Sequence, residues 1–146
     1  MPDPRFIHLR LHTEYSLLEG AMRLKKLPAQ IAAMDMPAVA VTDTNNMFAA
    51  LEFAVGAAKE GVQPIMGCQV DLEYLVAGLG EKPVPPAPIV LLAQTEAGYE
   101  HLMKLNSYLY LREDGSLLHV TLEELEAHTT DVICLTGGSD GPLGRL

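Results

Sequence analysis

The sequence predicts an α/β domain with a mainly parallel sheet and one antiparallel pair. Strand-like and helix-like patterns alternate along the chain, and polar side chains follow directly after its apolar runs. The run Ala38-Val39-Ala40-Val41 is typical of a strand buried on both faces of a parallel sheet. At 146 residues, 49% of them hydrophobic, the chain is long enough for one domain with its own core. An open sheet and part of a barrel both repeat the same βα unit, so both stay open at this point.

The first half of the chain alternates strands and helices. Pro28 suits the first turn of a helix, Met36-Pro37 ends that helix, and Gly61 stops the next one at a left-handed position. In order, the expected elements are a strand at 7–11, a helix at 28–34, a strand at 38–41, a helix at 47–60 and a strand at 64–70.

An antiparallel pair begins the second half. The segment Ala77–Pro88 holds four of the ten prolines and lacks a helical crossover, so it is expected to join strand 69–76 to strand 89–93 as an irregular connection. Thr95 is expected to cap a helix over 96–110, and Thr121 with Glu124 forms a capping-box pattern. That second helix should end near residue 128, and a last strand is expected at 132–135.

Charge and cysteine content narrow the function classes. The net charge of −9 argues against nucleic-acid binding by this segment, and a solvated helix start explains the cluster Arg23, Lys25 and Lys26. Cys68 and Cys134 lack metal-site spacing and are expected to be buried and unpaired, as in a reducing compartment. No basic start precedes an apolar run and no apolar stretch could cross a membrane, so we expect no membrane contact and a cytoplasmic protein.

The segment from His8 to Ser16 carries the strongest functional signal. Alternate residues of a strand share a face, so His8, Arg10 and His12 should point the same way. Histidines at this spacing suit a divalent cation, whereas an arginine is a permanent cation and cannot be a ligand. We expect Arg10 to replace a lost metal by pairing with Glu19 or Asp43, and the alternative is an exposed arginine on the strand edge.

Other candidate groups carry weaker signals. Ser16 lies near His12 in sequence, but no base and orienting group can be assigned to it from spacing. The segment 136–139 could cradle a phosphate but lacks the Gly-Lys-Ser/Thr ending of a P-loop, so a plain turn is favoured. His101, His119 and His128 have no ligand-spaced partners and are interpreted as surface or helix-end residues.

Four blocks in order, at residues 8–20, 40–47, 64–69 and 91–102, resemble the amino-terminal PHP (polymerase and histidinol phosphatase) domain of bacterial DNA polymerase III alpha subunits. The resemblance implies a distorted (β/α)7 barrel, of which residues 1–146 would be roughly the first half. It also implies a full-length DNA-directed DNA polymerase, a nucleotidyltransferase acting in DNA replication. Its catalytic carboxylates and Mg²⁺ would lie beyond Leu146, so no catalytic residue is expected in this fragment.

Carried over position by position, the resemblance implies a degenerate metal site. His8, His12 and Asp43 match family ligands, and Glu19 keeps a carboxylate where an aspartate is common. Other ligand positions are changed. The family's histidine, histidine, glutamate and histidine are replaced, in that order, by Arg10, Thr44, Gln69 and Pro88. The full set of vestigial positions is His8, Arg10, His12, Glu19, Asp43, Thr44, Gln69 and Pro88, with no metal expected.

The resemblance therefore implies a metal-free structural module that docks the proofreading exonuclease subunit. Other replicase subunits would be further partners, and DNA would be contacted through the rest of the full-length protein. The alternative is an active metal-dependent phosphoesterase, a proofreading exonuclease or pyrophosphatase, that uses His8, His12, Glu19 and Asp43 with ligands from beyond the chain. A stand-alone α/β binding protein is a third possibility.

Overall fold

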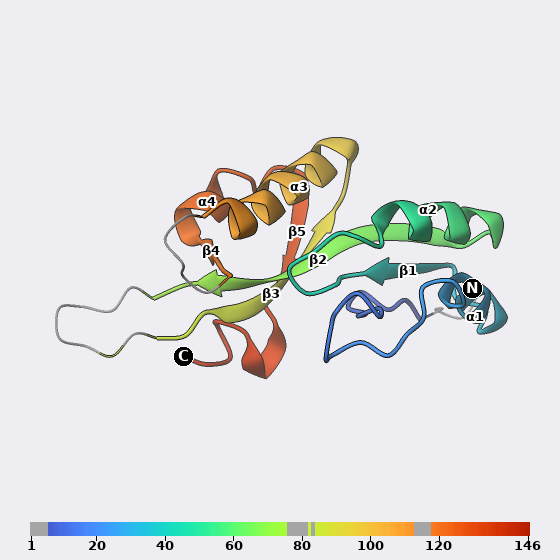
Figure 1. Cartoon of the computed structure of the whole chain (residues 1–146), viewed down its shortest axis with the longest axis horizontal. Coiled ribbons are helices and arrows are strands. Elements are labelled where there is room, and N and C mark those ends of the chain that lie inside the picture. The colour runs from blue at the N-terminus through green and yellow to red at the C-terminus, as the bar shows by residue number, and fades with distance from the viewer. Residues whose placement is uncertain (1–5, 76–81, 83, 113–117) are drawn as a thin grey trace, which may run out of the picture. The chain divides into compact units, whose positions relative to one another are not determined.

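The computed structural model describes residues 6–75, 82, 84–112 and 118–146 (Figure 1). The chain forms two compact units, residues 1–68 and 69–146, and each is considered by itself. The boundary falls inside strand β2 (Gln63–Glu73), which contributes to both units. The strand order is β1-β2-β3-β5, with β4 pairing to β2 off this path, so the sheet is mixed.

The first unit is built on a parallel strand pair. Strand β1 (Ala38–Val41) pairs with β2 from Ala38 opposite Gln63 to Val41 opposite Met66. Helices α1 (Leu27–Ala33) and α2 (Ala50–Lys59) bury side chains into one core. The core residues share apolar character and near-complete burial: Leu24, Leu27, Ile31, Val39, Val41, Ala49, Phe53, Ala57 and Val62.

The prediction of a strand at 7–11 is wrong, because this segment forms an isolated bridge and not a regular strand. The segment lies beside β1, where His8 bridges Val39, but it carries one extra residue. The backbone N–H of Ala40 donates to His8 O, and the backbone N–H of Thr42 donates to Leu11 O. Between these two hydrogen bonds the chain advances three residues in segment 8–11 but only two in segment 40–42. The Leu11 N–H donates to the Thr42 hydroxyl, which interrupts the ladder. This bulge-like irregularity shifts the side-chain alternation after residue 8.

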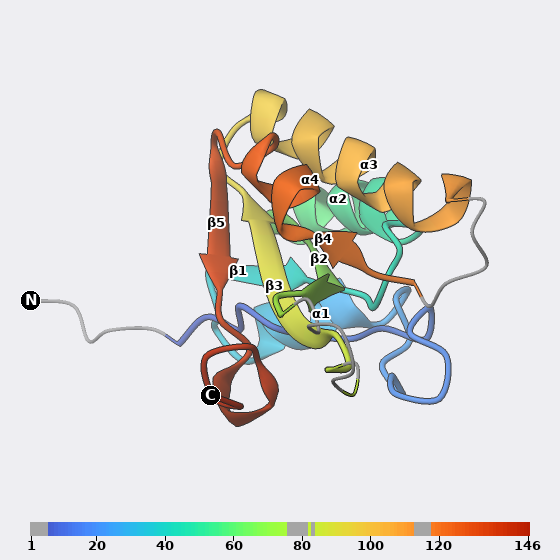
Figure 2. The same ribbon diagram turned by 90° about the vertical axis from the view of Figure 1, so that its left-hand side faces the viewer.

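The second unit places helices against antiparallel strands. Strand β3 (Ala87–Ala93) pairs antiparallel with β5 (Val132–Leu135), and Figure 1 shows β3 running back beside β2. Helix α3 (Glu96–Leu111) buries Leu102, Leu105 and Leu109, the face expected from sequence. Strand β4 (Val120–Thr121), helix α4 (Leu122–Glu126) and a 3-10 turn (Gly138–Asp140) complete the unit, with α3 and α4 on the same side of the strands in Figure 2.

The sheet is less parallel than expected. Strands β1 and β4 pair with β2 in parallel, but β5 runs against β3. A single crossover helix after β3 would return the chain to the start of β3, and the next strand would then run parallel to it. Helices α3 and α4 together return the chain to the end of β3, so β5 starts beside Ala93 and runs antiparallel. There the Gln94 N–H donates to Asp131 O, and Gly98 leaves no room for a Cβ, which would lie 2.1 Å from that oxygen.

Several element boundaries differ from the expectation. Helix α2 begins three residues late because the Asn46 side chain accepts from the Phe48 N–H and holds a turn ahead of the helix. The strands expected at 64–70 and 69–76 form the single strand β2, which ends at Glu73. Helix α4 ends earlier than expected, and the two-residue β4 was not predicted. Strand β3 begins at Ala87, so the expected irregular connection ends sooner, and its residues 77–81 and 83 lie outside the described residues.

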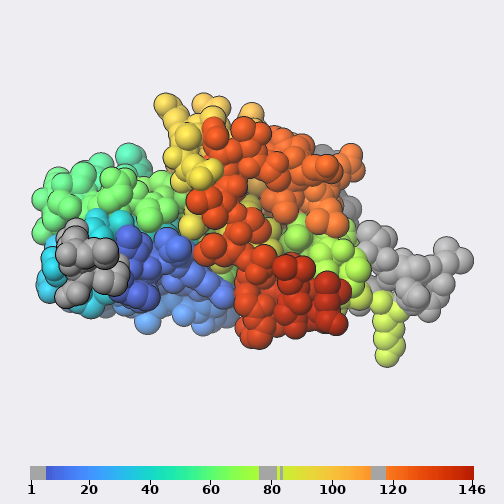
Figure 3. All heavy atoms as spheres, turned by 180° about the vertical axis from the view of Figure 1, so that it is seen from behind, coloured from blue at the N-terminus to red at the C-terminus, as the bar shows by residue number. Residues whose placement is uncertain are grey.

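Cys134 is exposed, which corrects the expectation that both cysteines are buried. It lies on β5, the last strand of the sheet order, and Figure 3 shows this segment open on one face. Cys68 is buried, and neither cysteine forms a disulfide. Among the helices of the described residues, none is both long and apolar enough to cross a membrane.

Candidate functional site

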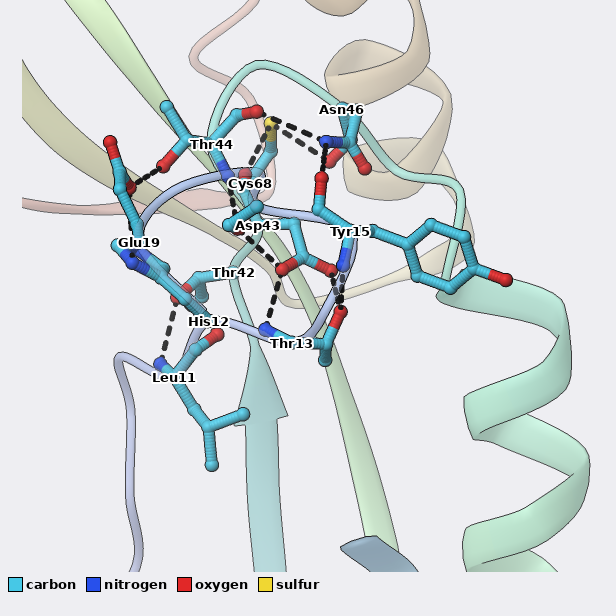
Figure 4. A network of polar contacts seen from close by, with 11 residues as sticks. Leu11, His12, Thr13, Tyr15, Glu19, Thr42, Asp43, Thr44, Asn46 and Cys68 are labelled. Carbon is cyan, nitrogen blue, oxygen red and sulfur yellow. Dashed lines mark hydrogen bonds and ion pairs between the residues drawn. The ribbon is translucent and has the colours of Figure 1, made fainter. Parts of the chain in front are cut away.

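Asp43 is the centre of a buried polar network in the first unit. It lies two residues beyond β1 and is 1% exposed. Its Oδ1 accepts from the Thr13 backbone N–H at 2.7 Å and from the Ser16 hydroxyl at 2.6 Å, and its Oδ2 accepts from the Thr13 hydroxyl at 2.7 Å (Figure 4). Three donors compensate for the loss of hydration that burial of this carboxylate entails. Asp43 therefore tethers residues 13–16 to the end of β1.

The tethered segment is a tight loop. The backbone N–H groups of Glu19 and Gly20 donate to Ser16 O, and Leu18 has a positive φ of 69°. At Gly20 a Cβ would lie 1.8 Å from Thr13 O, so only glycine allows this approach of the two backbones. The loop closes on itself and presents the Glu19 side chain.

Glu19, His12 and Thr44 form a second polar cluster. The Thr44 hydroxyl donates to Glu19 Oε2 at 2.6 Å, and His12 Nδ1 lies 3.3 Å from the same oxygen. The Thr44 backbone N–H donates to the Ser16 hydroxyl oxygen, which connects this cluster to Asp43. His12 is thus a pocket histidine held by a carboxylate (Figure 4).

A cavity of about 530 Å³ lies beside this cluster. It brings together His8, Arg10, His12 and Glu19 of the predicted set, and it is completed by Leu11, Gly20, Ala21 and Met22. Leu11 lines the cavity although strict alternation would place it on the opposite face, and it also packs against the core of the first unit. Arg10 is exposed on the rim, and its pairing with a carboxylate stays a prediction.

Gln69 and Pro88 belong to the second unit. Gln69 is 6% exposed and lies in the middle of β2, which corrects the expectation that it falls at the end of a strand. Pro88 is the second residue of β3, and its carbonyl oxygen approaches the backbone of Gly137. Gly137 itself, with a φ of 78°, leads into the 3-10 turn, in agreement with the plain turn favoured for this segment.

The polar groups of this site do not fit a bound divalent cation. Such a site needs several oxygen or nitrogen donors free to converge. Both Asp43 oxygens and one Glu19 oxygen accept hydrogen bonds from the protein, and Arg10 lines the same cavity as His8 and His12. Over the part of the chain that the structure describes, no three His, Cys, Asp or Glu side chains form a group able to hold a metal.

Sequence reasoning missed Thr13 and Asn46, and it considered Ser16 only as a nucleophile. Ser16 is 2% exposed and its hydroxyl is engaged by Asp43. Asn46 donates to Tyr15 O and Thr44 O, and the Cys68 thiol lies 3.5 Å from the carbonyl oxygens of Asp43 and Asn46. The small hydroxyl residues directly after segment 8–12 were the available signal, because Ser and Thr satisfy buried carboxylates at close range.

The second unit holds two further polar clusters. In one, the capping box expected at α4 is confirmed, and Arg112 reaches Glu124 at 2.8 Å. Burial raises the pKa of Glu124, but hydrogen bonds from the Thr121 backbone and Arg112 and the charge of Arg112 outweigh it, so its pKa lies below the usual value.

The other cluster contains two histidines expected at the surface. His101 and His128 approach with Nδ1 atoms 2.9 Å apart, and the Tyr108 hydroxyl lies 3.1 Å from His128 Nε2. Burial, then the nearby positive charges of His101 and Lys104, lower the pKa of His128. His119 is 9% exposed, so its placement at the surface was wrong; its Nε2 lies 3.9 Å from Glu73 Oε2.

The fold and the site define an α/β domain with a buried polar network and an adjoining cavity beyond its first strand. A comparison with family models then identifies the family: the PHP domain model matches residues 8–146, and the chain belongs to the PHP domain family. This agrees with the resemblance carried by the sequence blocks.

The chain is similar in sequence to DNA polymerase III alpha subunits. It is 38% identical over 144 residues to the DNA polymerase III subunit alpha of Caulobacter vibrioides, and 36% identical over 143 residues to that of Rickettsia felis. It is 36% identical over 148 residues to the same subunit of Vibrio cholerae. These alignments cover 97%, 97% and 99% of this chain but only 12%, 11% and 12% of the relatives, so the chain spans about an eighth of their length.

Solved structures support the fold alone. An amidohydrolase from Chromobacterium violaceum, whose structure holds sulfate and no metal, matches with a TM-score of 0.52 and 23% identity over 70% of this chain and 32% of that one. A candidate metal-dependent phosphoesterase from Bifidobacterium adolescentis matches with a TM-score of 0.50 and 16% identity, again over 70% and 32% of the two chains.

Proposed function

We propose that this chain is the metal-free PHP region of a replicative DNA polymerase III alpha subunit, and that it serves as a structural and docking module for the proofreading exonuclease subunit. The family match and the identity to alpha subunits of three bacteria support the replicase context. In the full-length protein, DNA synthesis, the Mg²⁺ that supports it and the contacts with DNA and other replicase subunits belong to segments beyond residue 146. The full-length protein acts in the cytoplasm. The segments beyond residue 146 also complete the PHP barrel.

The engagement of the acidic side chains by the protein itself carries this proposal. In a working metal centre, carboxylate oxygens face the cation and lower the pKa of a bound water. Here Asp43 accepts three hydrogen bonds within the loop it tethers, and Glu19 accepts one from Thr44. A guanidinium at residue 10 adds a fixed positive charge at the rim of the cavity, which disfavours a cation there. The old ligand positions thus serve to hold the loop.

Metal titration is the first test. Purified protein is titrated with Mn²⁺ and with Zn²⁺ by calorimetry, and the metal content of the same samples is measured. We expect no stoichiometric binding, both in this chain and in a longer form that spans the complete domain. Stoichiometric binding by the longer form that His8→Ala abolishes would contradict the proposal and favour the phosphoesterase alternative, which rests on the shared cavity of His8, His12 and Glu19.

Exonuclease docking needs a separate test. The full-length protein and a form without residues 1–146 are compared for binding to the purified exonuclease subunit by surface plasmon resonance. We expect the deletion to abolish the complex while the remaining protein still extends a primed template, which shows that it has folded. An unchanged affinity after the deletion would remove the docking role but leave the metal-free assignment standing.

A further inference from the structure

A groove between α1 and α2 has no role in the site described above. Its volume is about 400 Å³, and its lining comes only from residues 24–28 and 51–59 of the first unit. None of these residues lines the cavity at His12 and Glu19. The groove is therefore a separate surface feature.

The floor of the groove is set by close helix packing. Gly56 lies in the middle of α2, where glycine costs about 1 kcal/mol relative to alanine. A Cβ at this position would lie 3.1 Å from Pro28 Cγ on α1, so glycine allows the two helices to approach. Leu24 and Pro28 are buried there, which gives the groove a rigid apolar floor.

The wall on α2 is apolar and open to solvent. Leu51 and Val55 lie four residues apart, one turn along the same helix face, and are 78% and 49% exposed. Two aliphatic side chains beside an apolar floor match the shape that receives the apolar face of an amphipathic helix, whose anchors recur at i, i+3 or i+4 and i+7.

The charges at the rim indicate the sign of the partner. Lys25 on the α1 side and Lys59 near the end of α2 are both exposed, and the lining of the groove contains one acidic residue, Glu52. This basic rim stands in a chain whose net charge is −9. Electrostatic complementarity at a rim favours partners of opposite charge and increases their rate of association. A membrane surface would also suit lysines beside leucine, but a flat lipid surface does not fill a concave groove between two helices, whereas a helix does.

We propose that the α1–α2 groove binds a short acidic amphipathic helix of a partner protein, with aliphatic anchors on Leu51 and Val55 and carboxylates beside Lys25 and Lys59. This proposal stands apart from the docking of the exonuclease subunit, because it names a surface and a partner chemistry and holds whichever protein supplies the helix.

Matched peptides provide the probe. Two fluorescein-labelled helical peptides carry the same leucines on one face and either glutamates or lysines on the other, and each is titrated with the full chain by fluorescence anisotropy. We expect the acidic peptide to bind at least about tenfold more tightly at low salt, with the difference shrinking as salt increases. Equal affinities for the two peptides, or binding that saturates only with phosphatidylserine vesicles, would overturn the proposal.

Variants localise the binding to the groove. Leu51→Asp should lose the acidic peptide, whereas Leu111→Asp, at a leucine 74% exposed at the end of α3, should bind as the unaltered chain does. The double change Lys25→Glu with Lys59→Glu should reverse the peptide preference, and Lys104→Glu should not. All five positions are exposed, and far-UV circular dichroism verifies folding. Retained binding by Leu51→Asp would refute the groove as the site.

Discussion

Replacement of Asp43 by alanine tests whether this carboxylate now has a structural role. Alanine removes the acceptor from three buried donors, which are the Thr13 backbone N–H, the Thr13 hydroxyl and the Ser16 hydroxyl. An orphaned buried donor costs about 1–3 kcal/mol, and the two hydroxyls can turn toward other acceptors whereas the backbone N–H cannot. We therefore expect the free energy of unfolding to fall by about 3–5 kcal/mol, less than the full sum.

Asparagine at position 43 separates charge from hydrogen bonding. Its carbonyl oxygen can still accept from the Thr13 N–H and the Ser16 hydroxyl, so Asp43→Asn should cost only about 1–2 kcal/mol. Ser16→Ala removes one donor and should cost about 1 kcal/mol. If Asp43 had no structural role, loss of its buried charge would instead leave the free energy of unfolding unchanged or increase it.

Urea denaturation followed by far-UV circular dichroism measures these changes, because the chain has no tryptophan to report by fluorescence. Asp140→Ala is the matched control, since Asp140 is an exposed acid in the 3-10 turn. It should leave the midpoint nearly unchanged. A loss below about 1 kcal/mol for Asp43→Ala would refute the structural role argued here.

Three further changes test other parts of the molecule. The pKa of Glu124 lies below its usual value, so its pairing with Arg112 stabilises the fold above the unfolded-state pKa and is lost as the pH falls through the folded-state pKa. Urea midpoints of Glu124→Gln and the unaltered chain should differ at neutral pH and converge in acid. The pKa of His128 is lowered from 6.5, so the unfolded state takes up a proton at a higher pH than the folded state, and the free energy of unfolding should fall on acidification. His128→Gln should weaken this pH dependence. An NMR titration midpoint of His128 above 6.5 would contradict the prediction. Arg10→His with Thr44→His restores two imidazoles and removes the fixed charge, so it should increase Zn²⁺ affinity about tenfold or more in calorimetry, which an unchanged affinity would refute.

Sequence patterns correctly predicted the elements that are specified by interactions between residues close together in the sequence. Strands β1 and β5 have the predicted bounds, and α3 begins at the predicted residue because Thr95 caps it, accepting from the Gly98 N–H. The capping box of Thr121 and Glu124 forms as expected. In each case the signal comes from residues within a few positions of one another, so the sequence carries it directly.

Tertiary contacts decided the remaining elements. Strand β4 has only two residues, and it forms because Val120 pairs with Leu72 on β2. In segment 8–11, the Leu11 N–H donates to the Thr42 hydroxyl, 31 residues away in sequence, which interrupts the regular pairing with β1. No window of local sequence reports either contact.

The amino-acid sequence by itself determined the α/β class and the PHP family, because these follow from residue identity and order. Only the tertiary structure decided what the remaining acids do. Asp43 and Glu19 could serve a cation or the protein equally well as far as sequence goes, since a carboxylate accepts from any donor that comes within reach. The fold brings Thr13, Ser16 and Thr44 to them, and that proximity makes both carboxylates part of the scaffold.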